Sequence, residues 1–338
     1  MIIVSYHSEG ALAHTLPALV RELHDGDELI VVDNGSGDAS VAAIRRLAPD
    51  ATVVESGHNA GFPAGCNAGA ARARNPLLVF LNPDAVPQAG WGEAIRAPLA
   101  NGSGWAAWQA LVTQEHGAAV NTAGNVVHFT GVAWAGQAGT PLERADLRRR
   151  EVGYLSGACF AVRREAFEAV GGFDASYFLY HEDLDLSLRL RLAGGRLGLE
   201  PDARVEHDYE FVKGDYKWEL MERNRWATLV RTWPGPVLAL VAPALAATEL
   251  ANWLAAATGG WAGPKRKATG DVLRALPRWR RERAAIQAQR SVTPAEFAQW
   301  LDGDLSSAYL GAAARIAPLR AAVRLYWRAA RALLNRSA

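Results

Sequence analysis

The segment Tyr180-His181-Glu182-Asp183-Leu184-Asp185 places three carboxylates within four residues. Like charges this close disfavour each other's ionisation, so the pKa of at least one group should rise. Such a carboxylate can serve as a general base, although acidic residues also simply stabilise the start of a helix. If a helix begins near Asp183, then Glu182 and Asp183 lie at its mouth, and Asp185 lies about 200° around the axis from Asp183.

Two other carboxylates and a histidine follow apolar runs that have the character of strands. Asp33 follows two valines and suits a base N–H or a ribose hydroxyl, although Asn34-Gly35-Ser36 equally suits an Asx turn. Asp84 closes Leu81-Asn82-Pro83-Asp84 and suits one ligand position of Mg²⁺ or Mn²⁺, or an Asn-Pro-Asp turn. His207 follows a later apolar run, and a lone histidine is more often structural than a ligand.

A glycine-rich segment, Asn59 to Gly69, follows the third apolar run. Its glycines, among them Gly61 and Gly65, allow a ligand to approach the backbone closely. The helix expected after them favours an anion at its N-terminus. The segment matches neither the dinucleotide-binding fingerprint nor the Walker phosphate loop, so alone it indicates binding only weakly.

The elements that must position these groups alternate between strands and helices. We expect strands at residues 2–5, 29–32, 52–54 and 77–81, and helices at 11–23 and 41–47. Apolar strands that alternate with helices indicate a parallel α/β sheet, in which ligands bind at the carboxyl ends of the strands. Further along, we expect irregular strands and loops at 100–150, a short helix at 164–170, and a strand at 196–199 before a Pro-Asp turn.

Residues 183–193 give conflicting signals. Five leucines alternate strictly with polar residues, as in a strand, yet leucine is a good helix former and is not β-branched. Acidic residues at the start, arginines near the end and Gly194-Gly195 after it are helix start and stop signals. We therefore predict a helix here.

In order and spacing, these elements resemble the inverting family-2 glycosyltransferases with the GT-A fold, in particular the rhamnosyltransferase-like branch that builds bacterial cell-wall and surface polysaccharides. The matching segments are Val4-Ser5-Tyr6, Val32-Asp33-Asn34-Gly35-Ser36, Asn59-Ala60-Gly61-Phe62, Leu81-Asn82-Pro83-Asp84, Gly171-Gly172-Phe173-Asp174, Glu182 to Arg189, and His207. The resemblance implies an α/β fold for residues 1–210, with a mostly parallel central sheet flanked by helices, and a helical C-terminal region at 211–338.

The resemblance also implies a role for each matching residue. Asp84 would hold Mg²⁺ or Mn²⁺ on the donor diphosphate, with His207 as a further ligand. Asn82 occupies the first place of the family's Asp-x-Asp motif, where it replaces a carboxylate. Asp33 would bind the nucleoside, and the other donor-binding positions would be Ser5, Tyr6, Asn59, Gly61 and Gly65.

The implied activity moves a sugar from a nucleotide diphosphate to a hydroxyl with inversion, because one displacement occurs without a covalent intermediate. A divalent cation neutralises the leaving pyrophosphate, and a carboxylate takes the acceptor's proton. Asp183 would be this base, with Glu182 and Asp185 shaping the acceptor side. The first expected donor is dTDP-rhamnose, followed by UDP-sugars, and the acceptor is a glycan or a lipid-linked molecule. An inactive sugar- or lipid-binding scaffold is the alternative, and the retained carboxylates argue against it.

Charge is spread unevenly along the chain. Residues 265–338 contain fifteen Lys/Arg and five Asp/Glu, whereas the first 264 residues carry a net charge of −9. Residues 316–334 show an apolar stripe beside four arginines, a pattern typical of a helix on an anionic membrane surface. Residues 237–257 are apolar but contain Glu249, so we expect a helix that lies on or dips into a membrane, or else a buried core hairpin.

The remaining features bear on location and rival functions. Two cysteines and an N-terminus without signal-peptide features predict a cytoplasmic protein, peripheral on the inner face of the plasma membrane. A nucleotidyltransferase should carry Arg or Lys in the loop after the first strand, and Tyr6 to Gly10 has neither. The basic tail lacks the motifs of nucleic-acid-binding modules, so we expect no nucleic-acid partner.

Overall fold

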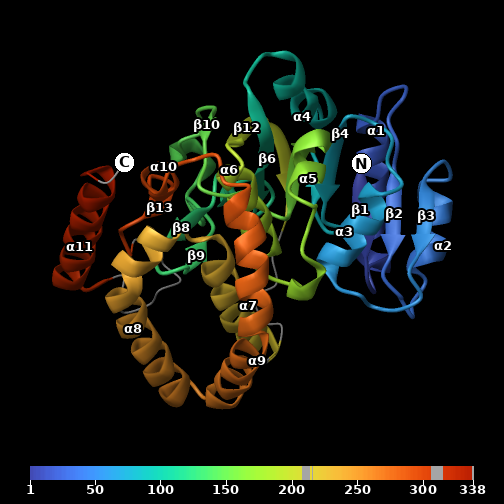
Figure 1. The fold of residues 1–338 in the computed structure, drawn as a ribbon. Coiled ribbons are helices and arrows are strands. Elements are labelled where there is room, and N and C mark those ends of the chain that lie inside the picture. The colour runs from blue at the N-terminus through green and yellow to red at the C-terminus, as the bar shows by residue number, and fades with distance from the viewer. Residues whose placement is uncertain (208–213, 215, 306–314, 337–338) are drawn as a thin grey trace. The chain divides into compact units, whose positions relative to one another are not determined.

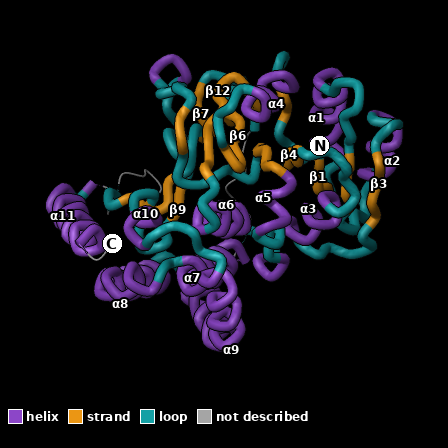
Figure 2. The backbone as a smooth tube through the Cα atoms, turned by 45° about the horizontal axis from the view of Figure 1, so that its top comes forward, coloured by secondary structure: helices purple, strands orange, loops and turns teal. Residues whose placement is uncertain are grey.

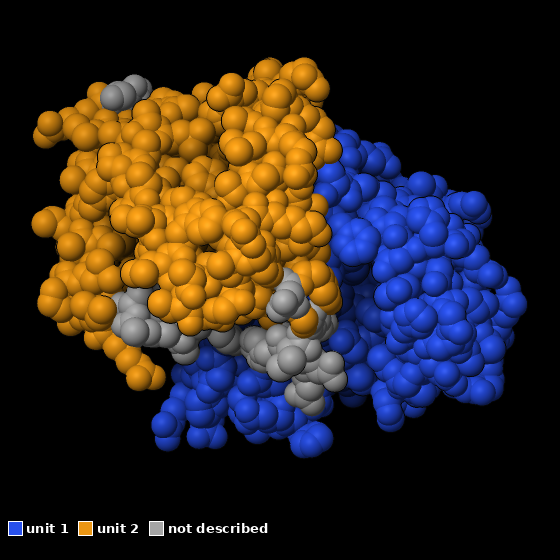
Figure 3. Space-filling model, turned by 90° about the horizontal axis from the view of Figure 1, so that it is seen from below, with its two compact units in different colours: residues 1–125, 135–190, 195–210 blue, residues 126–134, 191–194, 211–338 orange. Residues whose placement is uncertain are grey.

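The structure is a computed structural model that describes residues 1–207, 214, 216–305 and 315–336. The chain divides into two compact units, which Figure 3 colours separately. Unit 1 contains residues 1–125, 135–190 and 195–210, and unit 2 contains residues 126–134, 191–194 and 211–338. Two short segments that precede residue 210 in the chain therefore belong to the C-terminal unit.

Unit 1 is built on a ten-stranded sheet (Figure 1). Its main path runs in the order β10 (Arg150–Glu151), β12 (Arg196–Glu206), β6 (Trp105–Gln114), β11 (Cys159–Arg163), β4 (Leu77–Leu81), β1 (Ile2–Ser5), β2 (Ile30–Asp33) and β3 (Thr52–Glu55). Two short strands lie off this path, β5 (Val86–Pro87) beside β12 and β7 (Ala119–Thr122) beside β6. The four predicted strands β1 to β4 are mutually parallel, which confirms the predicted α/β sheet, while β11 is antiparallel to both of its neighbours.

Helices cover both faces of this sheet (Figure 2). Successive side chains of a strand point to opposite faces, so Ile3 and Val31 enter one core and Ile2 and Val32 the other. The first core is covered by α1 (Glu9–Glu22), α2 (Ser40–Leu47) and α4 (Trp91–Ala100). The second is covered by α3 (Phe62–Ala70), α5 (Arg164–Ala169) and α6 (Glu182–Leu192). Two short 3₁₀ helices, η1 (Leu142–Arg144) and η2 (Ala175–Tyr177), complete the helical elements of the unit.

Two strands differ from their prediction. Residues 100–150, expected to be irregular, contain β6, a ten-residue strand whose side chains are mostly buried. Because both faces of β6 are covered, its sequence shows no alternation of polar and apolar residues. The strand expected at 196–199 continues through the predicted turn as β12, with a shift of register between Glu200 and Arg204. An irregularity within the strand, in which residues 201–203 have no register partner on β6, thus takes the place of the Pro-Asp turn.

The predicted helix at 183–193 is confirmed as α6. Its five alternating leucines are at most 2% exposed, and Ser187 and Arg189 between them are buried as well. A helix buried on all sides has no polar face to reveal its period. The alternation of leucines with polar residues therefore does not indicate a strand here, because the helix buries both kinds of residue.

Unit 2 consists mainly of helices. They are α7 (Tyr216–Thr232), α8 (Gly235–Thr258), α9 (Ala262–Ala288), α10 (Pro294–Ala298) and α11 (Ala317–Arg336). A three-stranded sheet accompanies them, in the order β13 (Leu301–Asp302), β8 (Val126–His128) and β9 (Ala133–Trp134). Figure 1 shows α7 beside α9, with α8 running away from them.

Only part of the apolar stripe on residues 316–334, which was predicted to face a membrane, is exposed on the protein surface. Trp327, Ala330 and Leu334 of α11 are buried, and the ring of Trp327 stacks on Phe129 at 4.8 Å between centroids. The indole Nε1 of Trp327 also donates to the carbonyl of Leu301 at 3.1 Å. The expectation of a membrane-facing stripe is therefore wrong for this half of α11, because its apolar residues pack within unit 2.

Helix α8 contains the apolar residues 237–257 and is mostly exposed. Among the described residues it is the one helix long and apolar enough to cross a membrane, a test of length and composition alone. Only 17% of its most apolar window is buried, and Leu250 and Leu254 are 73% and 66% exposed. A core helix would be mostly buried, so the structure does not support the alternative of a buried hairpin.

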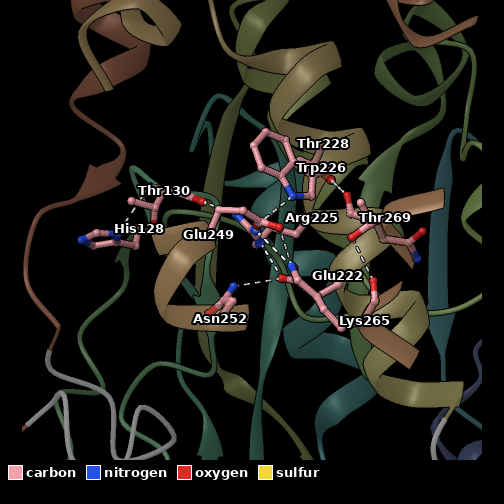
Figure 4. A network of polar contacts seen from close by, with 11 residues as sticks. His128, Thr130, Glu222, Arg225, Trp226, Thr228, Glu249, Asn252, Lys265 and Thr269 are labelled. Carbon is pink, nitrogen blue, oxygen red and sulfur yellow. Dashed lines mark hydrogen bonds and ion pairs between the residues drawn. The ribbon is translucent and has the colours of Figure 1, made fainter. Parts of the chain in front are cut away.

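A buried network of charges joins α7, α8 and α9 (Figure 4). Lys265 is 1% exposed, and its ammonium group contacts Glu222 and, at 2.7 Å, Glu249. Arg225 donates to the same two carboxylates at 2.8 and 2.9 Å. Burial acts to raise the pKa of Glu222, but Arg225 and Lys265 outweigh it and hold this pKa at about 2. Glu249, the charge within the apolar segment, is thus neutralised inside unit 2.

We expect Lys265→Ala to lower the free energy of unfolding by about 3–5 kcal/mol, because it leaves the buried carboxylate of Glu222 and the half-buried one of Glu249 short of a cation. The matched control is Lys267→Ala, two residues along the same helix, where an ammonium group that is 67% exposed pairs with Glu219 at 3.0 Å. Its loss should cost about 1 kcal/mol or less. Urea unfolding followed by tryptophan fluorescence measures both, and equal effects would show that the network is not stabilising.

Candidate active site

The carboxyl ends of several strands of unit 1 meet at one edge of the sheet. Ser5 at the end of β1 is the register partner of Asp33 at the end of β2. Leu81, the last residue of β4, pairs with Cys159 at the start of β11, and the N–H of Asn82 donates to the carbonyl of Ala158 at 2.9 Å. The predicted residues after β1, β2 and β4 and the segment before β11 therefore lie along the same edge.

Ser5 and Asp33 present buried polar atoms at this edge. Oδ2 of Asp33 accepts from the N–H groups of Gly35 and Ser36 at 3.2 and 3.1 Å, so the predicted Asx turn is present. Oδ1 of Asp33 and Oγ of Ser5 are buried without a hydrogen-bond partner among the described residues. Buried polar atoms normally have a partner, so these two oxygens are suited to a ligand's N–H or hydroxyl.

The loop after β2 is tied to the loop after β3. Nδ2 of Asn34 donates to Oδ1 of Asn59 at 3.0 Å, and Oδ1 of Asn34 accepts from the N–H of Ala60 at 3.1 Å. Asn59 also accepts from the N–H of Gly61 at 3.0 Å. Asn34 was not predicted as a site residue, yet its side chain holds Asn59 in place beside Asp33.

The predicted glycines have different local roles. Gly61 has a φ of +87°, and a Cβ there would lie 2.6 Å from the carbonyl of Phe178. A Cβ at Gly65 would lie 2.6 Å from the side chain of Val4, so this glycine lets α3 pack closely on β1. The structure thus gives Gly65 a packing role, and its contact with a donor stays a prediction. Tyr6, the remaining donor-site prediction, is 46% exposed after β1.

Asp84 and His207 lie side by side. The Nε2 atom of His207 is 3.2 Å from Oδ1 of Asp84, and the Asp84 side chain is 46% exposed. The histidine is buried and its backbone is fixed by two hydrogen bonds, from its N–H to the carbonyl of Thr113 and to its carbonyl from Asn121. The structure therefore brings together the two residues predicted to bind a metal.

This pair fits a cation that binds together with a diphosphate. No group of three or more His, Cys, Asp or Glu side chains that could hold a metal occurs in the described part of the chain. A hard cation such as Mg²⁺ commonly takes one or two carboxylates and completes its shell with phosphate oxygens and water. Asp84 and His207 can supply two ligands, with the carboxylate open to solvent for the rest.

Asp183 lies at the first turn of α6, where two backbone amides hold its carboxylate. Oδ2 accepts from the N–H of Gly157 at 2.9 Å, and Oδ1 accepts from the N–H of Leu184 at 2.7 Å. Gly157 precedes Ala158, which is bonded to Asn82 at the end of β4. Asp183 is therefore fixed to the same sheet edge as the Asn-Pro-Asp segment.

Glu182 and Asp183 differ in their affinity for a proton. Burial and the neighbouring charge of Asp183 raise the pKa of Glu182 to about 8. Burial also raises the pKa of Asp183, to about 6, since its amide hydrogen bonds offset part of the effect. Because backbone amides bond the carboxylate of Asp183, its pKa is raised less than that of Glu182, and Asp183 is the more easily ionised member of the pair. This difference suits Asp183 as the proton acceptor.

Asp185 occupies a different environment. It is completely buried, and its carboxylate accepts from the hydroxyl of Tyr177 at 3.0 Å and from Nε of Arg189 at 2.7 Å. These contacts anchor α6 to η2 and to its own second turn. The predicted place of Asp185 on the acceptor side stays a prediction, while the structure gives it a clear positioning role.

The segment before α6 adopts an unusual backbone conformation. Phe178, Tyr180 and His181 have φ values of 64°, 69° and 66°, which are rare for bulky residues. Strained backbone of this kind is concentrated at functional sites. Neither this conformation nor the role of Gly157 was predicted from sequence, because backbone dihedrals and amide directions leave no signal in residue type.

The fold of unit 1 is GT-A-like, and the comparisons with known proteins define the class as a glycosyltransferase. Residues 1–171 match the model of Glycosyl transferase family 2, and residues 137–327 match Glycosyl transferase family group 2. The chain belongs to glycosyltransferase family 2, which confirms the resemblance inferred from sequence.

Two curated relatives and one solved structure are similar to this chain. The chain is 31% identical over 233 residues to the N-acetylglucosaminyl-diphospho-decaprenol L-rhamnosyltransferase of Mycobacterium tuberculosis, a match covering 61% of this chain and 75% of the relative. It is 29% identical over 250 residues to the O-antigen biosynthesis protein RfbC of Myxococcus xanthus, covering 70% of this chain and 19% of that one. The crystal structure of GalNAc-T7 with UDP, GalNAc and Mn²⁺ shares the fold, with a TM-score of 0.56 at 16% identity over 71% of this chain and 49% of that one.

We expect Asp183→Asn to reduce turnover by at least about 10²-fold with donor affinity nearly unchanged, because it removes the predicted proton acceptor and keeps the volume. Turnover of the unaltered enzyme should rise with pH through about 6, as Asp183 loses its proton. Initial rates from pH 5 to 9 measure this. Glu182→Gln should keep that rise, and a Glu182→Gln variant that is inactive beside a normal Asp183→Asn variant would move the base to Glu182.

Proposed function

We propose that this protein transfers a sugar, with inversion, from a nucleotide diphosphate to a hydroxyl of a glycan or lipid-linked acceptor. The observation that carries the proposal is the grouping at one sheet edge of the Ser5–Asp33 oxygens, the Asp84–His207 pair and the amide-held Asp183. These suit, in turn, the nucleoside, the cation on the diphosphate, and the acceptor hydroxyl.

Each group has a distinct task in this reaction. Asp33 and Ser5 accept or donate hydrogen bonds to the nucleoside. Asp84 and His207 would hold a divalent cation, which when bound offsets the charge of the leaving diphosphate. Asp183 accepts the proton of the attacking hydroxyl, and the raised pKa of Glu182 disfavours a second negative charge beside it. A scaffold without activity would have no need of an ionised, amide-held carboxylate at this edge.

We propose dTDP-rhamnose as the donor, with UDP-sugars as the alternative. The support for this donor is the similarity of the chain to a rhamnosyltransferase. A ligand that binds only the folded protein stabilises it in proportion to ln(1 + [L]/Kd), so the correct donor should raise the melting temperature. A thermal-shift panel of nucleotide sugars with and without Mn²⁺ tests this choice. A larger shift with a UDP-sugar than with dTDP-rhamnose would favour the alternative.

Donor binding should depend on the cation. We expect Asp84→Ala to weaken binding of the donor in Mn²⁺ by roughly tenfold or more while the fold is kept, since it removes one of two protein ligands. Isothermal titration with Mn²⁺ and with chelator measures this, and Asp50→Ala on the surface is the control. Equal affinity in Mn²⁺ and chelator would contradict a metal role.

We also propose that unit 2 attaches to anionic membranes through the exposed face of α8. Its described exposed residues are uncharged, and its one acidic residue, Glu249, is paired inside the unit. A lipid-linked acceptor would give such attachment a purpose, and the location that we propose is peripheral, on the cytoplasmic face of the membrane.

We expect the double variant Leu250→Asp/Leu254→Asp to reduce binding to anionic vesicles by roughly tenfold or more. Each exposed leucine that enters the bilayer should contribute about 1.5–3 kcal/mol to the free energy of binding. Co-sedimentation with vesicles measures this. Leu325→Asp, at a 68% exposed position of α11, is the comparison. If that variant loses binding and the α8 variant does not, α11 is the anchor instead.

A further inference from the structure

Unit 2 contains an open cavity lined largely by arginines. Its volume is about 390 Å³, and its lining residues are Gly235, Arg280, Arg283, Ala284, Gln287 and Arg290. No acidic residue is among them. Three guanidinium groups around one cavity repel each other unless an anion lies between them.

Arg283 has a structural role on one side and faces the start of α8 on the other. Its Nη1 donates to the carbonyls of Val230 and Trp233 at 2.8 and 2.6 Å, which satisfies carbonyl groups at the end of α7. Its Nη2 lies beside Gly235, where a Cβ would be 3.8 Å away. Burial lowers the pKa of Arg283, and no acidic group offsets that effect.

The other two arginines also lack acidic partners. Nε of Arg290 is buried without a hydrogen-bond partner in the described part of the chain, and its Nη1 donates to the carbonyl of Val292. Arg280 is exposed and forms no ion pair with a described residue. By contrast, Arg278 and Arg274 on the same helix pair with Glu282 and Asp271. The cavity thus gathers arginines that the unit has left unpaired.

The first turn of α8 adds to this positive field. The helix begins at Gly235 after Pro234, and no side chain caps its N-terminus. The N–H groups and dipole at the start of a long helix favour an anion. The cavity therefore combines three cations with an uncapped helix start.

We propose that this cavity binds the phosphate of an anionic ligand through Arg280, Arg283 and Arg290. The planar guanidinium group binds phosphate oxygens through two parallel hydrogen bonds. The expected source is a phospholipid headgroup, because the exposed uncharged face of α8 starts at the same cavity. Free phosphate has the same chemistry. The site does not depend on the sugar-transfer activity proposed above.

The test compares two double variants of α9 in the full-length protein. Arg280→Gln/Arg290→Gln removes two cavity arginines and leaves Arg283 to hold the end of α7. Arg266→Gln/Arg281→Gln removes the same charge from exposed positions that do not line the cavity. Two probes are used without metal, namely inorganic phosphate by titration calorimetry and vesicles with or without phosphatidylglycerol by co-sedimentation. Circular dichroism verifies that both variants fold.

We expect the cavity variant to weaken binding by about thirtyfold, about fivefold for each arginine, and the control to have a much smaller effect. Loss of both phosphate and phosphatidylglycerol binding would identify a lipid headgroup site. Loss of phosphate binding alone would support the site with free phosphate as its ligand. Equal effects of the two variants, or no binding of either probe by the unaltered protein, would overturn the proposal.

Discussion

Two neighbouring carboxylates at the buried start of α6 cannot both be ionised at neutral pH without a large electrostatic cost. The structure favours Asp183 for the charge, because amides of two other residues, Gly157 and Leu184, donate to its carboxylate, whereas Oε2 of Glu182 has no hydrogen-bond partner among the described residues. The pKa of Asp183 is therefore raised less than that of Glu182, and Asp183 is the carboxylate that ionises more easily. This hydrogen bond forms only if the N–H of Gly157 is held in a fixed place, so the site depends on the segment that contains Gly157.

That place is fixed by the sheet. Gly157 precedes β11, which pairs with β4, and β4 pairs with β1. Each strand contributes alternate residues to cores on both faces, so a shift of register would move apolar side chains between the two cores. The positions of Asp33, Asp84 and Asp183 are therefore tied to the packing of residues such as Ile2 and Ile3. Loops carry the reacting groups, while the buried strands set where the loops begin.

The parts of this arrangement that depend on residue type were predicted from sequence. Short runs of β-branched and other apolar residues identified β1 to β4, and Asp33 and Asp84 were correctly placed at or after strand ends. The strand β6 was not recognised, because burial on both faces removes alternation. The role of Gly157 was also missed, since a backbone N–H has the same chemistry in every residue but proline. The stripe on α11 shows a third limit, because an apolar period does not say whether a membrane or the protein itself covers it, and Trp327 packs within unit 2.

The same limit applies to net charge as a guide to partners. The tail from residue 265 has a net charge of +10, yet several of its cations are used internally. Lys265 neutralises buried carboxylates, and Arg320 and Arg324 both contact Asp304. A paired cation contributes little to the field that a membrane or a phosphate experiences. Recognition of an anion depends on the cations that have no acidic partner in the folded protein. In unit 2 these include the arginines of the cavity at the start of α8, whose exposed face is uncharged.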